Sequence, residues 1–319
     1  MPRMRTLTSV LYRRLWAVGC RRQVLNRSRF LPTAYSPQPT AALFYATLSS
    51  RRAVPRQRQT LPNFAAFFDL AKSKVLAVQE FTLLGLRAFR NVFGRPRYLA
   101  DTLIQMDVIG VGSLPIIVLT GFFTGAVLAL QTSKTLQTFG EVTLTGQVVA
   151  LSLVRELGPV LTALMVAGRN ASGMASEIGS MLVSEQIDAM RALGTDPSKK
   201  LVTPRLVATV SMLPLLTIIS DFVGVTGGFM VSFFIIRMDP VQYWTTAYQS
   251  LHFEDVFQGM IKPFIFGYIV AMVGCYFGLT TRGGTQGVGR STTQAVVAAS
   301  VLILTTDFFI TKLLLALLG

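Results

Sequence analysis

The chain has few of the residues that build metal and catalytic sites. It contains one histidine, His252, and two cysteines, Cys20 and Cys275. Cys20 lies in the N-terminal tail and Cys275 in a long apolar segment, so we expect no disulfide between them. Because these residues stand alone in the sequence, we also expect no transition-metal site.

Acidic residues are missing from the N-terminal tail. Residues 1–63 hold twelve Arg and no Asp or Glu, and they account for most of the net charge of +15. Beside apolar segments, such a tail favours anionic lipid or a targeting receptor over nucleic acid. Residues 1–62 are also rich in Ser, Thr and Pro and resemble an organelle transit peptide. The alternative is a disordered tail or a misassigned start, with translation beginning near Val54 or Leu61.

Charge is also sparse in the rest of the chain, where long apolar segments dominate. Charged residues make up 14% of the sequence, whereas a soluble domain usually carries about 25%. Five segments with little charge are each long enough to cross a bilayer, which takes about 20 residues. We therefore predict an all-α membrane protein with five transmembrane helices. The expected spans are residues 108–131, 144–169, 205–236, 256–281 and 293–318.

Residues 63–106 precede the five-span domain, which we place at residues 107–319. Apolar residues recur at helical spacing from Phe64 to Val78, among charged ones, so residues 63–92 predict an amphipathic helix. This helix is too charged to span and is expected in the membrane interface, followed by a second short amphipathic piece over residues 98–106. Lys and Arg gather in the loops after spans two and four, which predicts a cytoplasmic N-terminus.

Two features inside the predicted spans concern packing and function. Gly121 and Gly125 form a small-residue stripe that lets another helix approach closely. Ionisable residues at membrane depth are costly unless they pair or are hydrated, so they predict an inward-facing charge network. A structural ion-pair role and a direct role in transport both remain open for this network. Its expected members are Arg155, Glu156, Lys262 and Asp307, and Asp221 is a further acid in the third span.

Residues 177–197, between spans two and three, have the pattern of a soluble amphipathic helix. Gly194 is placed to end this helix, and Pro197 follows as a stop. Its exposed charges suit a protein partner, and an ordinary loop helix on the membrane surface is the alternative. The residues expected to contact the partner are Glu177, Met181, Glu185, Asp188, Met190 and Arg191.

Residues 284–291, GTQGVGRS, nearly match a phosphate-binding loop. Arg290 stands where that loop needs Lys, a membrane span precedes the segment instead of a strand, and no room remains for a nucleotide-binding domain. We therefore expect the glycines to form a tight turn between spans. We expect no ATP binding by this chain and no cofactor of its own.

Several separate motifs resemble the MlaE-type permease family. They are RELGPVLTALMVAGR at 155–169, SEIGSMLVSEQIDAMRALGTDP after it, LPLLT at 213–217, RGGTQGVGRSTTQAVV at 282–297 and DFF at 307–309. The resemblance covers roughly residues 64–319. It implies the membrane half of an ABC importer-like system that moves phospholipids between two membranes. It further implies a homodimer, an ATP-binding ABC ATPase subunit that docks on the helix at 177–197, and an MCE-domain lipid-binding protein.

The resemblance implies a multi-pass protein of the bacterial inner membrane or, alternatively, of the plastid inner envelope. A proton-coupled secondary transporter that uses Glu156 and Asp307 as relays is one alternative, although the sequence has no internal repeat of the kind common in that class. An intramembrane enzyme is another, although His252 has no obvious catalytic partners.

Overall fold

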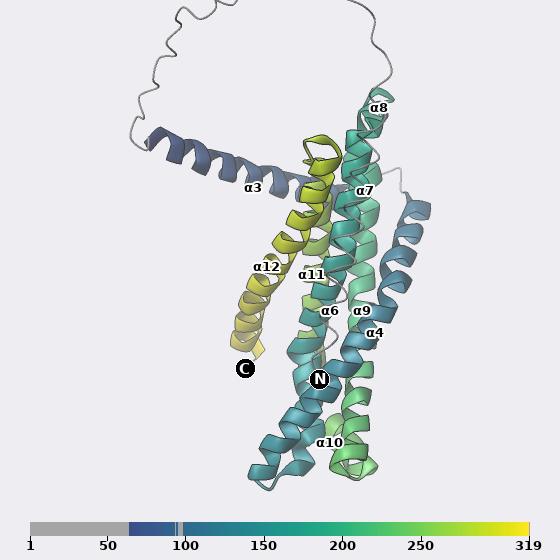
Figure 1. Cartoon of the computed structure of the whole chain (residues 1–319), viewed down its shortest axis with the longest axis vertical. Coiled ribbons are helices and arrows are strands. Elements are labelled where there is room, and N and C mark those ends of the chain that lie inside the picture. The colour runs from purple at the N-terminus through teal and green to yellow at the C-terminus, as the bar shows by residue number, and fades with distance from the viewer. Residues whose placement is uncertain (1–63, 93, 95–97, 319) are drawn as a thin grey trace, which may run out of the picture. The chain divides into compact units, whose positions relative to one another are not determined.

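Long helices form the body of the protein, which the computed structural model describes over residues 64–92, 94 and 98–318 (Figure 1). Among these residues there is no strand. Segment η1 is a 3-10 turn, and the other η segments are π-helical turns. The elements are α3 (Phe64–Val92), α4 (Leu99–Thr138), η1 (Val142–Leu144), α5 (Thr145–Ser152), η2 (Leu153–Leu157), α6 (Gly158–Val166), η3 (Ala167–Ala171), α7 (Ser172–Val183), α8 (Gln186–Ala192), η4 (Ser198–Val202), α9 (Thr203–Val231), η5 (Ser232–Ile236), α10 (Pro240–Ser250), α11 (Phe253–Leu279) and α12 (Gly284–Leu318).

The five predicted spans are confirmed, and most of them extend beyond the expected ends. Each is long and apolar enough to cross a membrane. The second span is assembled from consecutive helical pieces, η1 through α7, which continue one another along the chain. The protein is therefore an all-α, multi-pass membrane protein. The spans are Leu99–Thr138, Val142–Val183, Ser198–Ile236, Phe253–Leu279 and Gly284–Leu317.

The N-terminal amphipathic helix is present as α3, which runs across one end of the long helices in Figure 1. Its later part holds it to the bundle, where Ala88 is buried in a cluster with Leu206 and Met272. The separate short piece predicted over residues 98–106 does not exist, because α4 continues without a break from Leu99 into the first span. No helix-breaking residue separates the two in the sequence, since Pro115 lies further on, inside the helix.

Helices α4 and α9 lie side by side over much of their length, and glycines set their separation. A Cβ on Gly121 would meet the backbone of Ser220, and one on Gly125 would clash with the backbone of Gly224. The close approach expected of the Gly121 and Gly125 stripe therefore takes place within one chain. Because α9 occupies the stripe, these glycines are not available as an interface between two copies of the chain.

Helix α10 was not predicted from the sequence. Asp239 precedes it in an extended conformation, and Pro240 takes the first position, where its missing N–H is not needed. Tyr243 is 1% exposed, and its hydroxyl donates a hydrogen bond to the Val225 carbonyl at 3.1 Å. Burial raises the pKa of this hydroxyl. The helix thus closes the end of the bundle opposite α8 (Figure 1).

The glycine-rich segment before the fifth span is helical, which corrects the predicted turn. The turn is confined to residues 280–283, and α12 begins at Gly284. Of the glycines in this segment, Gly283 and Gly284 have positive φ angles, of 94° and 65°, where glycine avoids the strain of a side chain. Ser291 is buried and accepts a hydrogen bond from the Thr281 hydroxyl at 2.9 Å. This geometry differs from the loop of free backbone N–H groups that cradles phosphate.

Candidate functional site

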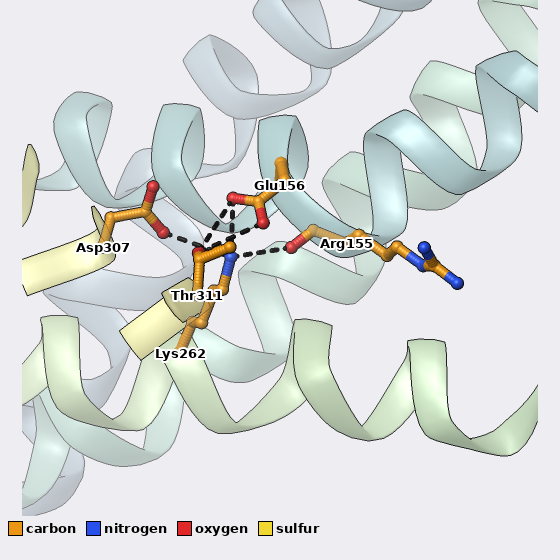
Figure 2. A network of polar contacts seen from close by, with 5 residues as sticks. All are labelled: Arg155, Glu156, Lys262, Asp307 and Thr311. Carbon is orange, nitrogen blue, oxygen red and sulfur yellow. Dashed lines mark hydrogen bonds and ion pairs between the residues drawn. The ribbon is translucent and has the colours of Figure 1, made fainter. Parts of the chain in front are cut away.

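Three ionisable side chains from three spans meet inside the bundle (Figure 2). Lys262 of α11 is 1% exposed, and its Nζ lies 2.6 Å from Glu156 Oε2 and 3.2 Å from Asp307 Oδ1. Glu156 belongs to η2 and Asp307 to α12. The Thr311 hydroxyl, one helical turn after Asp307, donates to Glu156 Oε1 at 3.2 Å. The structure thus brings together Glu156, Lys262 and Asp307, as the sequence predicted.

The third oxygen around the Lys262 ammonium is a backbone carbonyl. Nζ donates to the Arg155 carbonyl at 3.0 Å and to Glu156 Oε2 at 2.6 Å, whereas its contact with Asp307 is an ion pair without a hydrogen bond. In an α-helix that carbonyl would accept from the residue four positions later, which is Pro159 and has no N–H. The ELGP sequence therefore leaves a backbone acceptor at the place where Lys262 binds. A π-helical turn at this position fits the frequent use of such turns at functional sites.

Arg155 takes part in the network through its backbone, and its side chain points the other way in Figure 2. Its guanidinium pairs with Asp255 of α11, with Nε 2.6 Å from Oδ1. Asp255 is 2% exposed and also accepts from the His252 backbone N–H at 3.0 Å, which completes a capping box. Asp255 was missed by the sequence reasoning. The pattern of an N-cap residue followed three positions later by an acid could have indicated its capping role.

The charge network is buried at Lys262 and partly exposed at its two carboxylates. Lys262 is buried, whereas the Glu156 side chain is 40% exposed and the Asp307 side chain 19%. Two carboxylates face one ammonium, so these three groups carry a net charge of −1 when all are ionised. Asp221 stands apart: its Oδ1 is buried over Gly158 and has no hydrogen-bond partner. The site can therefore offer an exposed carboxylate whose position is fixed by a buried cation.

The segment predicted as one soluble helix over residues 177–197 is divided in two. Helix α7 ends at Val183, and Glu185 adopts a positive φ of 60° before α8 begins at Gln186. Ile178 is fully buried in the bundle, and Met181 and Met190 pack against the same cluster. Their apolar face therefore binds this chain's own core, which corrects the idea that these residues fill a groove on a partner. Leu193 is instead the most exposed large apolar residue of this segment, at 83%.

The charged residues of this segment have two different environments. Glu185 is exposed, and Asp188 and Arg191 form an exposed ion pair of 2.9 Å on α8. Glu177 lies in α7 and pairs at 2.7 Å with Arg205, which is 5% exposed. Glu177 therefore connects α7 with α9, and the surface open to a partner consists of α8 and Leu193.

Substitution of Glu177 by Gln should lower the stability of the protein. The change removes the charge that compensates Arg205, whose Nε already lacks a hydrogen-bond partner. A hydrogen bond to a charged group contributes about 1.5–3 kcal/mol, and we expect the lower part of that range because Glu177 is half exposed. The measurement is thermal unfolding of the purified chain, with Glu185→Gln as the control. Equal melting temperatures for both variants would show that the Glu177–Arg205 pair does not hold α7 to α9.

Fold and site together define a multi-pass membrane protein with a charged site inside its helical bundle. The chain belongs to the MlaE permease family, since the family model described as Permease MlaE matches residues 102–313.

Similar proteins support this assignment. A probable ABC transporter permease protein of Rickettsia typhi is 43% identical over 238 residues, covering 75% of this chain and 92% of that protein. The intermembrane phospholipid transport system permease protein MlaE of Haemophilus influenzae is 36% identical over 234 residues, covering 72% and 90%. The protein TRIGALACTOSYLDIACYLGLYCEROL 1, chloroplastic, of Arabidopsis thaliana is 34% identical over 276 residues, covering 86% and 77%.

Proposed function

We propose that this chain is the permease subunit of an ABC-type transporter that moves phospholipids between membranes. The observation that carries the proposal is the Glu156–Lys262–Asp307 network, which is held between three spans of an MlaE-family chain. The name of the Haemophilus relative supports phospholipid as the substrate. Charged groups at membrane depth usually serve a path for polar substrates, because their desolvation is costly otherwise.

The geometry suits a headgroup that carries charge. The Arg155 side chain is 43% exposed and that of Glu156 is 40% exposed, so both signs of charge are accessible around η2, although the two side chains point in different directions (Figure 2). Each of these side chains is fixed by a more deeply buried partner, Asp255 for Arg155 and Lys262 for Glu156. Preorganised groups bind with less loss of side-chain entropy than free ones.

The proposed transporter includes partner proteins and has a defined orientation in one membrane. A separate ABC ATPase subunit binds ATP and docks on the surface made by α8 and Leu193, which places this end and the N-terminus in the cytoplasm. An MCE-domain lipid-binding protein receives or delivers lipid at the α10 end, and two copies of the permease form a homodimer. The membrane is the bacterial inner membrane or, alternatively, the plastid inner envelope. The names of the bacterial and chloroplastic relatives support this pair of locations.

A proton-coupled transporter is the second candidate, and a specific observation favours it. Glu156 and Asp307 share one lysine, so a proton could bind one carboxylate while the other keeps the ion pair. The two candidates differ in their energy source. Lipid transfer that needs ATP and a bound ATPase supports the first, and transfer that follows a proton gradient without ATP supports the second.

Charge reversal on α8 should weaken the ATPase complex and leave the bundle intact. We expect Asp188→Lys to slow association in a salt-dependent way, because an exposed charge mainly steers the encounter. Leu193→Asp should lower retention of the ATPase by roughly tenfold, since it places a charge at an apolar contact. The measurement is co-purification of a soluble ATPase with the full chain at several salt concentrations.

The matched control is Glu141→Lys, an exposed acid between α4 and the second span. It should retain the ATPase, and all variants should keep the melting temperature of the unaltered chain. Normal ATPase retention by both α8 variants would assign α8 to the membrane surface and end the docking proposal.

A further inference from the structure

A second polar cluster lies in the second span, outside the charge network. Arg169 and Asn170 belong to η3, the next π-helical turn after η2, and both bind Ser113 of α4. The Ser113 hydroxyl accepts from Arg169 Nη1 at 3.1 Å and from Asn170 Nδ2 at 3.2 Å. Ser113 is fully buried and Asn170 is 6% exposed, whereas Arg169 is exposed. Two buried polar groups thus fix one end of an exposed guanidinium.

A glycine on α4 provides the place where this guanidinium lies. A Cβ on Gly112 would be 2.6 Å from both terminal nitrogens of Arg169, so a larger residue at position 112 would displace the guanidinium from this place. On the other side, a Cβ on Gly168 or Gly173 would meet no atom within 4 Å. The guanidinium is therefore held against α4, and the space beside it on the second span is open.

No acid balances the charge of Arg169 within the part of the chain that the structure describes. Four acids in the spans are paired elsewhere: Glu156 and Asp307 with Lys262, Asp255 with Arg155 and Glu177 with Arg205. Asp107 of α4 is exposed and forms no ion pair with Arg169. Asp221 faces Gly158, eleven positions before Arg169. An arginine without an acidic partner near the end of the predicted span can take its counter-charge from a bound anion.

We propose that Arg169, positioned by Ser113, Asn170 and Gly112, binds the phosphate of a glycerophospholipid headgroup. The site lies 13 positions beyond Glu156 on the same span, about 20 Å along the helix at 1.5 Å per residue. It is therefore a second headgroup site, separate from the Lys262 network and nearer to α8. The inference rests on the proposed transport of phospholipid and adds a location on the lipid path.

Phosphate fits this site better than a carboxylate from a second copy of the chain. A guanidinium presents two parallel N–H groups that match two phosphate oxygens. The Arg169 guanidinium donates one hydrogen bond, to Ser113, and leaves its other donors for a ligand. The acids that pair with Lys262, Arg155 and Arg205 would be engaged in the same way in a second copy. Asp107, exposed and six positions before Ser113 on α4, is an acid that a second copy could still offer.

The test uses the full chain in phosphatidylcholine vesicles with a trace of phosphatidylglycerol that carries a photoactivatable group on its headgroup. We expect crosslinks on α4 and η3 near Gly112 and Arg169. Arg169→Gln should reduce them roughly tenfold, the loss expected for one charge-assisted contact. Arg169→Lys should give an intermediate yield, and Ser113→Ala roughly a threefold loss because the guanidinium loses its anchor. Arg237→Gln, at an exposed arginine between α9 and α10, is the matched control and should change nothing.

Three comparisons distinguish the source of the anion. A photoactivatable diacylglycerol, which lacks phosphate, should crosslink equally in the unaltered chain and in Arg169→Gln. Excess inorganic phosphate should not compete, and competition would assign the site to free phosphate and overturn the lipid assignment. Loss of dimer in Arg169→Gln, restored by also changing Asp107→Asn, would assign Arg169 to a contact between copies and likewise overturn the proposal.

Thermal unfolding and lipid transfer distinguish the second headgroup site from the proposed transport function. Arg169→Gln should not lower the melting temperature, because the substitution removes an uncompensated charge. Full headgroup crosslinking in Arg169→Gln, together with normal lipid transfer, would overturn the second headgroup site and leave the transport proposal standing. Absence of lipid transfer by the unaltered chain with its ATPase would instead count against the transport proposal itself.

Discussion

Lys262→Met should stop transport and destabilise the bundle. The substitution keeps most of the side-chain volume but leaves Glu156 and Asp307 together without a counter-charge. It also leaves the Arg155 carbonyl without its donor, since Pro159 cannot replace it. Removal of one partner from a buried ion pair typically costs about 3–5 kcal/mol. The measurements are thermal unfolding of the purified chain and lipid transfer from vesicles.

Lys312→Met is the matched control, because Lys312 lies on α12 near Asp307 in sequence but is exposed. It should leave both melting temperature and transfer unchanged. A triple variant, Lys262→Met with Glu156→Gln and Asp307→Asn, should recover much of the stability because no charge is left unpaired, yet it should remain inactive. Full activity in that neutral variant would mean that the network only holds the helices together, which is the structural role left open by the sequence.

Gly125→Ala should destabilise the protein although it adds a single methyl group. The new Cβ would clash with the backbone carbonyl and Cα of Gly224, and helix backbones cannot move aside as a flexible side chain can. Overpacking of a core typically costs about 1–3 kcal/mol, and we expect the upper end because α4 and α9 must separate. The measurement is thermal unfolding of purified Gly125→Ala and Gly289→Ala beside the unaltered chain.

Gly289→Ala is the control for this prediction. Gly289 is helical, and a Cβ there meets no atom within 4 Å. Because Ala is favoured over Gly in helices by up to about 1 kcal/mol, this variant should be as stable as the unaltered chain or slightly more stable. Unchanged or increased stability in both variants would show that the α4–α9 approach does not require glycine at position 125.

The sequence predicted the features that follow from the low polarity of a membrane interior. Long apolar segments can only be spans, and charges inside them must find partners, so the five spans and the meeting of Glu156, Lys262 and Asp307 could be predicted. A glycine stripe likewise predicted a close helix approach. Which helix would occupy Gly121 and Gly125 was beyond the sequence, because that depends on how all five spans assemble.

Other features of the site depend on local geometry that a regular helical pattern does not contain. Arg155 and Glu156 lie within the π-helical turn η2, whose geometry differs from the regular α-helix that the sequence pattern predicts. The division of the predicted helix at Glu185 depends on one positive φ angle. The contact of Arg169 with Ser113 joins residues 56 positions apart and needs Gly112 beside it.

The most direct test of the central claim is ATP-dependent transfer of labelled glycerophospholipid from vesicles that hold the full chain with its co-purified ATPase. We predict transfer by the unaltered chain and by Lys312→Met, and no transfer by Lys262→Met or in the absence of ATP. Equal transfer by Lys262→Met, or transfer that follows a proton gradient without ATP, would contradict the account of an ABC permease whose lipid path includes the Lys262 network.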